Sequence, residues 1–272
     1  MSFLFEKAMK RHFIFTCIAL FAIAPTVHGD SKSVGRARRF SASFRNRLTI
    51  SPLIAAPGTF ELDVINGFTE AGSYWLPTTL RFTPDSGNSY LKHTEWGINA
   101  DLLDSIVTDG HRTSQLSDHV TFTSTTAAKW GGVNFGIAPT VTYLTRGDGG
   151  FRFGGAALAR VDPGLNSIGA TLSWSGATKP NSNNPPGIWD LGFGFGRKLG
   201  ANGLANHFTP HTSLTIEKQT AANRSYTILE GIEYQMNDRF SVDLSGQHVG
   251  IATGSIDHQI LLGLNWTITA PH

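Results

Sequence analysis

The chain has 272 residues, of which 30 are glycine, 11% are aromatic and only 15% are charged, and its formal net charge is +2. This balance gives no electrostatic case for nucleic-acid binding, which usually needs a strongly basic surface. The mean hydropathy of -0.10 makes a bundle of membrane-spanning helices a poor fit. A membrane β-barrel remains compatible with it, because only alternate residues of a barrel face lipid.

Residues 1–29 have the pattern of a secretory signal peptide. A short basic stretch precedes a continuous apolar run at 13–24, and a cleavage candidate follows at 27–29. The run is too short to span the ~30 Å of bilayer hydrocarbon. Because the single cysteine, Cys17, lies inside it, we expect a mature chain without disulfides, thiolate metal sites or a cysteine nucleophile.

Residues 30–57 form a polar, basic segment that ends in proline-containing breaks before the first strand. Its cations are Lys32, Arg36, Arg38, Arg39, Arg45 and Arg47. Two interpretations stay open. The segment could be a flexible mature N-terminus, or it could lie inside a pore where its arginines meet acidic wall residues.

From residue 58 onward, bulky apolar residues alternate with polar residues or glycine, and a period of two indicates β-strands. In 189–196, Trp, Leu and Phe alternate with Asp or Gly, which suits an aromatic face toward lipid and a smooth face toward a crowded barrel interior. Twelve such stretches of about ten residues are long enough to cross a bilayer at a tilt of ~45°. They are 59–68, 76–83, 95–102, 120–130, 133–144, 151–161, 167–175, 189–199, 211–218, 226–236, 239–248 and 259–268.

The connections between these stretches alternate in length. Outer-membrane barrels have short periplasmic turns and longer external loops. If the first strand leaves the periplasm, the long polar connections 103–119 and 176–188 are external, whereas 84–93 and 199–210 are longer inner turns than the rule prefers. We therefore predict an all-β fold: a transmembrane antiparallel up-and-down β-barrel of about 12 strands over residues 58–272, in a Gram-negative outer membrane.

Further details of the strands support contacts with lipid and with the barrel-assembly machinery. Trp75, Trp130, Trp174, Trp189 and Trp266 lie near predicted strand ends, where an aromatic girdle is expected. The stretch 263–268 resembles, in part, the C-terminal signal by which outer-membrane barrels are recognised for assembly. Strict alternation would point Glu230 toward lipid, so we expect a β-bulge near Leu229 that resets the phase.

Charged and polar residues on the second face of each strand are the candidate pore lining, because charges facing lipid are costlier than charges facing a wet interior. These residues are Glu61, Asp63, Arg81, Glu95, Asn99, Asp101, Lys129, Arg152, Asp190 and Asp243. We expect them to create a transverse field, acidic toward strands one to three and basic toward strands four to six, with Arg81 bridging its acidic neighbours.

Catalytic and cofactor motifs are weak throughout. Gly192, Gly194 and Gly196 lack the βαβ context of a nucleotide-binding loop. Ser-His-acid triples can be drawn at 117–119 and 255–258, but hydroxyl residues are abundant and no nucleophile elbow is present. We predict no catalytic residues, no metal site and no cofactor.

Several strand motifs resemble the outer-membrane barrels named for the MetA pathway of phenol degradation. The resemblance covers about residues 50–268 and rests on short motifs, but excludes the arginine-rich segment. The motifs are Ala56-Pro57-Gly58-Thr59-Phe60-Glu61-Leu62, Leu80-Arg81-Phe82, Phe208-Thr209-Pro210-His211, Gly231-Ile232-Glu233-Tyr234 and Val242-Asp243-Leu244-Ser245. It implies a single-chain barrel that takes up apolar or aromatic compounds, and it supplies no catalytic or binding residues.

These observations predict an outer-membrane channel or transporter for small molecules. Two alternatives stay open: a barrel enzyme acting on lipid or peptide, and a closed structural or surface-binding barrel.

Overall fold

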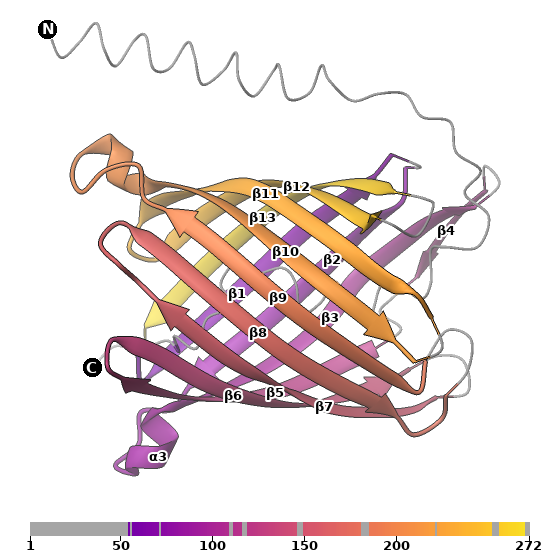
Figure 1. Cartoon of the computed structure of the whole chain (residues 1–272), viewed down its shortest axis with the longest axis horizontal. Helices are drawn as coiled ribbons and strands as arrows, with labels where there is room; N and C mark the ends of the chain where they lie inside the picture. Colours follow the sequence, from indigo (N-terminus) through magenta and orange to yellow (C-terminus); the bar gives the residue numbers. More distant parts are fainter. Residues whose placement is uncertain are drawn as a thin grey trace, which may run out of the picture. The chain divides into compact units, whose positions relative to one another are not determined.

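The computed structural model describes residues 54, 56–70, 72–108, 111–115, 119–145, 149–180, 185–220, 222–251 and 256–269. The predicted signal peptide and most of the basic segment lie outside these residues. The described part is almost entirely β-structure (Figure 1). Its elements are β1 (Thr59–Thr69), β2 (Tyr74–Thr83), α3 (Ser89–Lys92), β3 (Thr94–Thr108), β4 (His111–Gln115), β5 (His119–Trp130), β6 (Val133–Leu144), β7 (Gly150–Val161), β8 (Asn166–Ala177), β9 (Gly187–Arg197), η1 (Leu204–His207), β10 (Phe208–Gln219), β11 (Arg224–Asn237), β12 (Phe240–Ile251) and β13 (Asp257–Thr269).

All strands except β4 form a closed antiparallel barrel of twelve strands. Neighbours in the sheet follow chain order, β1 pairs with β13, and the pairing of β2 with both β1 and β3 completes the ring. Closure leaves no unpaired strand edge, which is what a sheet needs in order to cross a membrane. The predicted all-β, twelve-stranded, up-and-down barrel is confirmed.

The outer surface of the barrel is apolar, and its inner surface holds the buried residues. In β9, Trp189, Phe193 and Phe195 are 51%, 46% and 41% exposed, whereas the intervening Gly192 and Gly194 are buried. Phe60 and Phe82 stack on the outside with ring centroids 4.4 Å apart. Bulky residues therefore face outward and small or polar residues face inward, as the alternation predicts.

The two ends of the barrel differ in their connections. One end, which we call the periplasmic end, holds the starts of β1 and β3 and the tight turns at 131–132 and 162–165. The helix α3 and the short helix η1 fill the two longer connections at this end, which explains why 84–93 and 199–210 exceed a simple turn. Among the described residues, no helix is long and apolar enough to cross a membrane.

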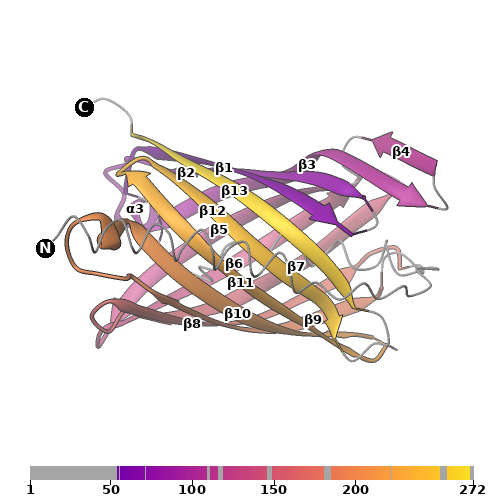
Figure 2. The same cartoon turned by 90° about the horizontal axis from the view of Figure 1, so that it is seen from above.

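The opposite, outer end carries an extra hairpin. The sequence suggests a loop from 103 to 119, but β3 continues to Thr108 and pairs there with β4. Figure 2 shows β4 projecting beyond the barrel rim at the end opposite α3. The end of β3 and β4 therefore form a hairpin at this end of the barrel.

Two orientations expected from the sequence are wrong. Glu230 is exposed on the outer face, where it lies opposite Thr212 and Gly246 in the two neighbouring strands. The register of β11 is regular on both sides of Leu229, and its irregularities lie at 226–227 and 235–237 instead. Trp75 lies against Gly67 on the inner face, so it is not a girdle residue, whereas the other four tryptophans are exposed as predicted.

Candidate functional site

The barrel interior is the candidate site, and the register of the strands defines its wall. Directly opposed residues on neighbouring antiparallel strands share a face. Beginning from buried Thr59 and Thr83, this rule places Glu61 opposite Arg81, and Asp63 opposite Thr79, on the inner face. Applied to each strand pair in turn, the same rule places all ten predicted lining residues on the inner face. They are Glu61, Asp63, Arg81, Glu95, Asn99, Asp101, Lys129, Arg152, Asp190 and Asp243. Their role in lining a pore stays a prediction.

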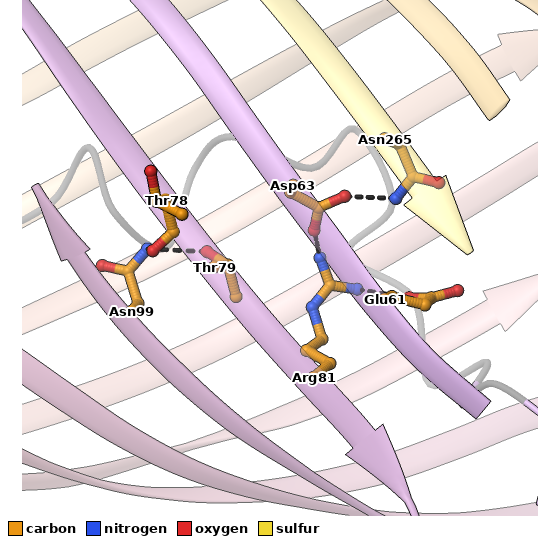
Figure 3. Close-up of polar contacts among 7 residues, drawn as sticks. All are labelled: Glu61, Asp63, Thr78, Thr79, Arg81, Asn99 and Asn265. Atoms are coloured by element: carbon orange, nitrogen blue, oxygen red, sulfur yellow. Dashed lines mark hydrogen bonds and ion pairs between the residues drawn. The ribbon is translucent and has the colours of Figure 1, made fainter. Parts of the chain in front are cut away.

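An ion-pair cluster occupies the wall at β1, β2 and β13 (Figure 3). The Nη1 atom of Arg81 lies 3.0 Å from Oε2 of Glu61, and the other guanidinium nitrogen contacts Asp63. The amide of Asn265 donates to the second oxygen of Asp63. Their side chains are 12–15% exposed, so the cluster is partly buried and holds Arg81 along the wall. The predicted bridge is therefore present for the acids of β1.

Hydroxyl groups continue the wall on the next strands. The amide of Asn99 donates to Oγ1 of Thr79 over 2.7 Å, and the hydroxyls of Thr121 and Thr142 are 2.9 Å apart. Between β5 and β10 most central inner positions carry small side chains or none, and Leu158, opposite Thr171, is a bulky exception. The positions with small side chains or none are Thr121, Thr123, Thr125, Ala138, Thr140, Gly154, Ala156, Thr171, Ser173, Gly192, Gly194, Ser213 and Thr215. The side of the interior formed by β5–β10 is therefore lined mainly by small side chains, and the opposite side carries the charged cluster.

Arg152, on β7, is buried among polar and acidic groups of other strands. It is 3% exposed, and its Nη1 donates to the carbonyl of Pro185 over 2.9 Å. Its Nε and Nη2 approach the hydroxyl and carbonyl of Ser175, each at 3.3 Å. Asp190 and Glu217, on β9 and β10, interact with it electrostatically. Arg152 therefore interacts with acids on β9 and β10, outside strands one to six, and the expected segregation of acid and base across those six strands stays a prediction.

The remaining bases lie at the periplasmic end. Lys129 is exposed one residue before the end of β5. Arg160 is also on the inner face, and its Nε lies 2.7 Å from Asp162 in the following turn. Neither base reaches the middle of the barrel from its place in its strand.

Several inner-wall residues were missed in the sequence, above all acids. Asp104 lies opposite Trp75, and Asp257 shares the inner face with Gln259, which donates to it over 2.7 Å. Two further acids, Glu217 and Glu233, face the predicted Asp190 and Asp243 directly across a strand pair. The alternation along β10 and β11 places Glu217 and Glu233 on one face of each strand. Only the register between strands shows which acids they face.

A His-Asp-Ser cluster lies on the wall of β10 and β12. Nε2 of His211 is 2.5 Å from Oδ2 of Asp243, and the hydroxyl of Ser245 donates to the other oxygen of Asp243. Gly231 lies between them, and a Cβ there would meet both Ser245 and His211 within 2.5 Å. Because the serine donates to the acid and not to the histidine, the cluster lacks the hydroxyl-to-imidazole contact of an activated nucleophile.

The triples considered in the sequence do not assemble into such a site either. Asp257 points inward, whereas His258 points outward and lies 2.6 Å from His248 between their Nδ1 atoms. His119 is buried on the inner face at 1% exposure, and residues 117, 118 and 255 lie outside the described residues. Among the described residues, no group of three or more His, Cys, Asp or Glu side chains is placed to hold a metal ion.

Comparison with known proteins identifies the fold. No protein-family model matches the chain, and no curated protein matches it. Among solved structures, the KdgM porin superposes with a TM-score of 0.52 at 10% identity, covering 78% of this chain and 99% of that one. The NanC porin gives a TM-score of 0.54 at 11% identity, covering 75% of this chain and 98% of that one.

The chain has the fold of the outer-membrane porins. At this identity the likeness concerns the porin fold alone. The apolar outer surface described above is the surface that a porin fold presents to lipid.

Proposed function

We propose that the protein resides in the outer membrane and is a channel for small water-soluble solutes. The observation that carries the proposal is the two-sided interior: small side chains on β5–β10 opposite the fixed charges of Arg81, Glu61 and Asp63. A wall of small side chains leaves room for a solute. Fixed charges orient that solute, as in other pores with charged linings. The interior should favour cations, because acids outnumber bases on the wall.

The substrate class is part of this proposal. A similar barrel, the KdgM porin, has been solved in complex with disordered oligogalacturonate, which supports passage of polar solutes through this architecture. The resemblance to the MetA-pathway barrels suggests apolar or aromatic solutes instead, and no family model supports it. Trp75 is the one Trp, Tyr or Phe ring that the register places on the inner face of the described strands, so the wall favours polar solutes.

Ion selectivity tests whether the predicted residues line the path. Replacing Arg152 with Glu should shift the selectivity of the purified, refolded protein toward cations, and replacing Glu95 with Lys should shift it toward anions. Glu230→Gln, on the outer face, is the matched control and should leave selectivity unchanged. Unchanged selectivity in both inner-wall variants of a conducting protein would show that these side chains do not line the path.

An enzyme remains the rival function. Serine-directed fluorophosphonate probes should leave the folded protein unlabelled, because the hydroxyl of Ser245 donates to Asp243 and not to a histidine, so it lacks the imidazole contact of an activated serine. Stoichiometric labelling of any serine would favour the enzyme.

A further inference from the structure

The lipid-facing surface of the barrel is hollowed over β6–β9. The groove there has a volume of about 410 Å³, and its lining includes Ile137, Gly155, Ala157, Leu172 and Trp174. Its floor is the outer face of β7, where Gly155 and Ala157 carry little or no side chain. Ile137 and Leu172 rise on the two sides of Ala157 and are 63% and 50% exposed. The groove is therefore open, apolar and long enough to hold part of an acyl chain.

Four outward-facing residues lie in line across β8–β11, beginning at the edge of this groove. The register pairs Trp174 with Trp189, Trp189 with Lys218, and Lys218 with Arg224. The four strands that carry them are side by side in the sheet (Figure 1). Directly opposed residues have their Cβ atoms about 5 Å apart, so the four side chains form one continuous patch. We call this patch the Trp-Lys-Arg row.

The Trp-Lys-Arg row rises toward the outer end of the barrel. Trp174 is three residues before the end of β8, whereas Lys218 is one residue before the end of β10 and Arg224 is the first residue of β11. The indoles of Trp174 and Trp189 lie 6.2 Å apart between their ring centroids, at the level of an aromatic girdle. The two cations therefore lie beyond the girdle, at the level of the lipid headgroups.

The two cations are directly opposed, and like charges in this position destabilise a strand pair unless negative charge lies beside them. The ammonium group of Lys218 donates to the carbonyl of Ala222, which leaves further hydrogens for another acceptor. None of the ion pairs among the described residues involves Lys218 or Arg224. Glu217 precedes Lys218 in the sequence but faces the interior. The outer surface here is thus complementary to an anion.

We propose that this surface binds a phosphorylated lipid of the outer leaflet, whose phosphate contacts Lys218 and Arg224 and whose acyl chain lies in the groove. Ammonium and guanidinium groups form charge-assisted hydrogen bonds with phosphate oxygens. The two indoles occupy the level between the phosphate and the chain, where amphipathic rings are favoured. A soluble phosphate ion would contact the cations but leave the groove unused, so the groove indicates a lipid. The site lies on the lipid-facing surface and does not depend on whether the interior conducts.

Native mass spectrometry of the purified, refolded protein in detergent micelles tests the proposal, with dipalmitoyl phosphatidic acid as the probe. The protein should retain phosphatidic acid in preference to phosphatidylcholine with the same chains, and excess inorganic phosphate should not displace it. Combining Lys218→Gln with Arg224→Gln should weaken retention about thirtyfold, the effect of two basic side chains at a membrane surface. Gly155→Leu should also weaken it by filling the groove, since a Cβ at Gly155 has only ordinary contacts, the nearest at 3.5 Å.

The matched control makes the same change of charge at the other end of the barrel. Combining Arg197→Gln with Lys198→Gln, at the periplasmic end of β9, should leave retention unchanged. Circular dichroism verifies that each variant has folded. Retention as strong as in the native protein, in either the Lys218, Arg224 variant or Gly155→Leu, would overturn the proposal. Displacement by inorganic phosphate, or equal retention of phosphatidylcholine, would overturn it as well.

Discussion

Phe193→Arg measures directly whether the aromatic face of the barrel contacts lipid. Phe193 is 46% exposed near the middle of β9, and its outward neighbours across the sheet are Ala170 and Leu214. No acid lies opposite this position on either neighbouring strand, so a new arginine would enter hydrocarbon without a partner. The expected loss is about 2–4 kcal/mol, the cost of arginine near the midplane of a bilayer.

The assay is reversible denaturant unfolding of the refolded protein in lipid vesicles, followed by tryptophan fluorescence. Ser213→Arg is the matched control, because Ser213 lies opposite Gly194 on the inner face of the adjacent strand. It should lose less stability than Phe193→Arg, since the interior offers polar partners. A loss at Phe193 below about 1 kcal/mol, the value expected near the interface, would contradict a lipid-facing midplane position.

Three further substitutions test local features by the same unfolding assay. Arg81→Met should cost about 1–3 kcal/mol, between the values for exposed and buried ion pairs, and adding Glu61→Gln should recover part of it; full additivity would argue against the bridge. Glu230→Leu should raise stability by about 1–2 kcal/mol by removing a carboxylate from the lipid face, and a loss would show that this carboxylate has a partner in the membrane. Gly67→Ala should cost about 1–3 kcal/mol because its Cβ would lie 2.3 Å from the ring of Trp75, and Trp75→Phe should reduce that cost.

The sequence was sufficient for the barrel because its determinants are local. Alternation in stretches such as 189–196 reports the two faces of a strand without knowledge of its neighbours. The hairpin at the end of β3 lacks this signal, since β4 has no apolar residue and the apolar Ile106 and Val107 of β3 are adjacent instead of alternating. Glu230 differs from its prediction for the opposite reason. The cost of a charge in lipid predicts a β-bulge, but the strand keeps its regular alternation there.

The interior was predictable only in part. Alternation within each strand predicts that Glu95 and Arg81 lie on the inner face. Their contacts on neighbouring strands can be predicted only when the register between the strands is known. Trp75 points inward because its partner Gly67 leaves space for the ring, and that pairing is not visible in either strand alone. Arg152 reaches the region of Glu217, which is distant in sequence, so its surroundings could not be derived from parity.

Single-channel recording in planar bilayers tests the central claim most directly. The refolded protein and its Glu95→Lys variant are compared at the same salt concentration. We expect discrete conductance steps that are cation-selective in the native protein and shifted toward anions in the variant, because acids outnumber bases on the inner wall. The absence of steps above the lipid background in both proteins, with correct folding verified, would contradict a channel.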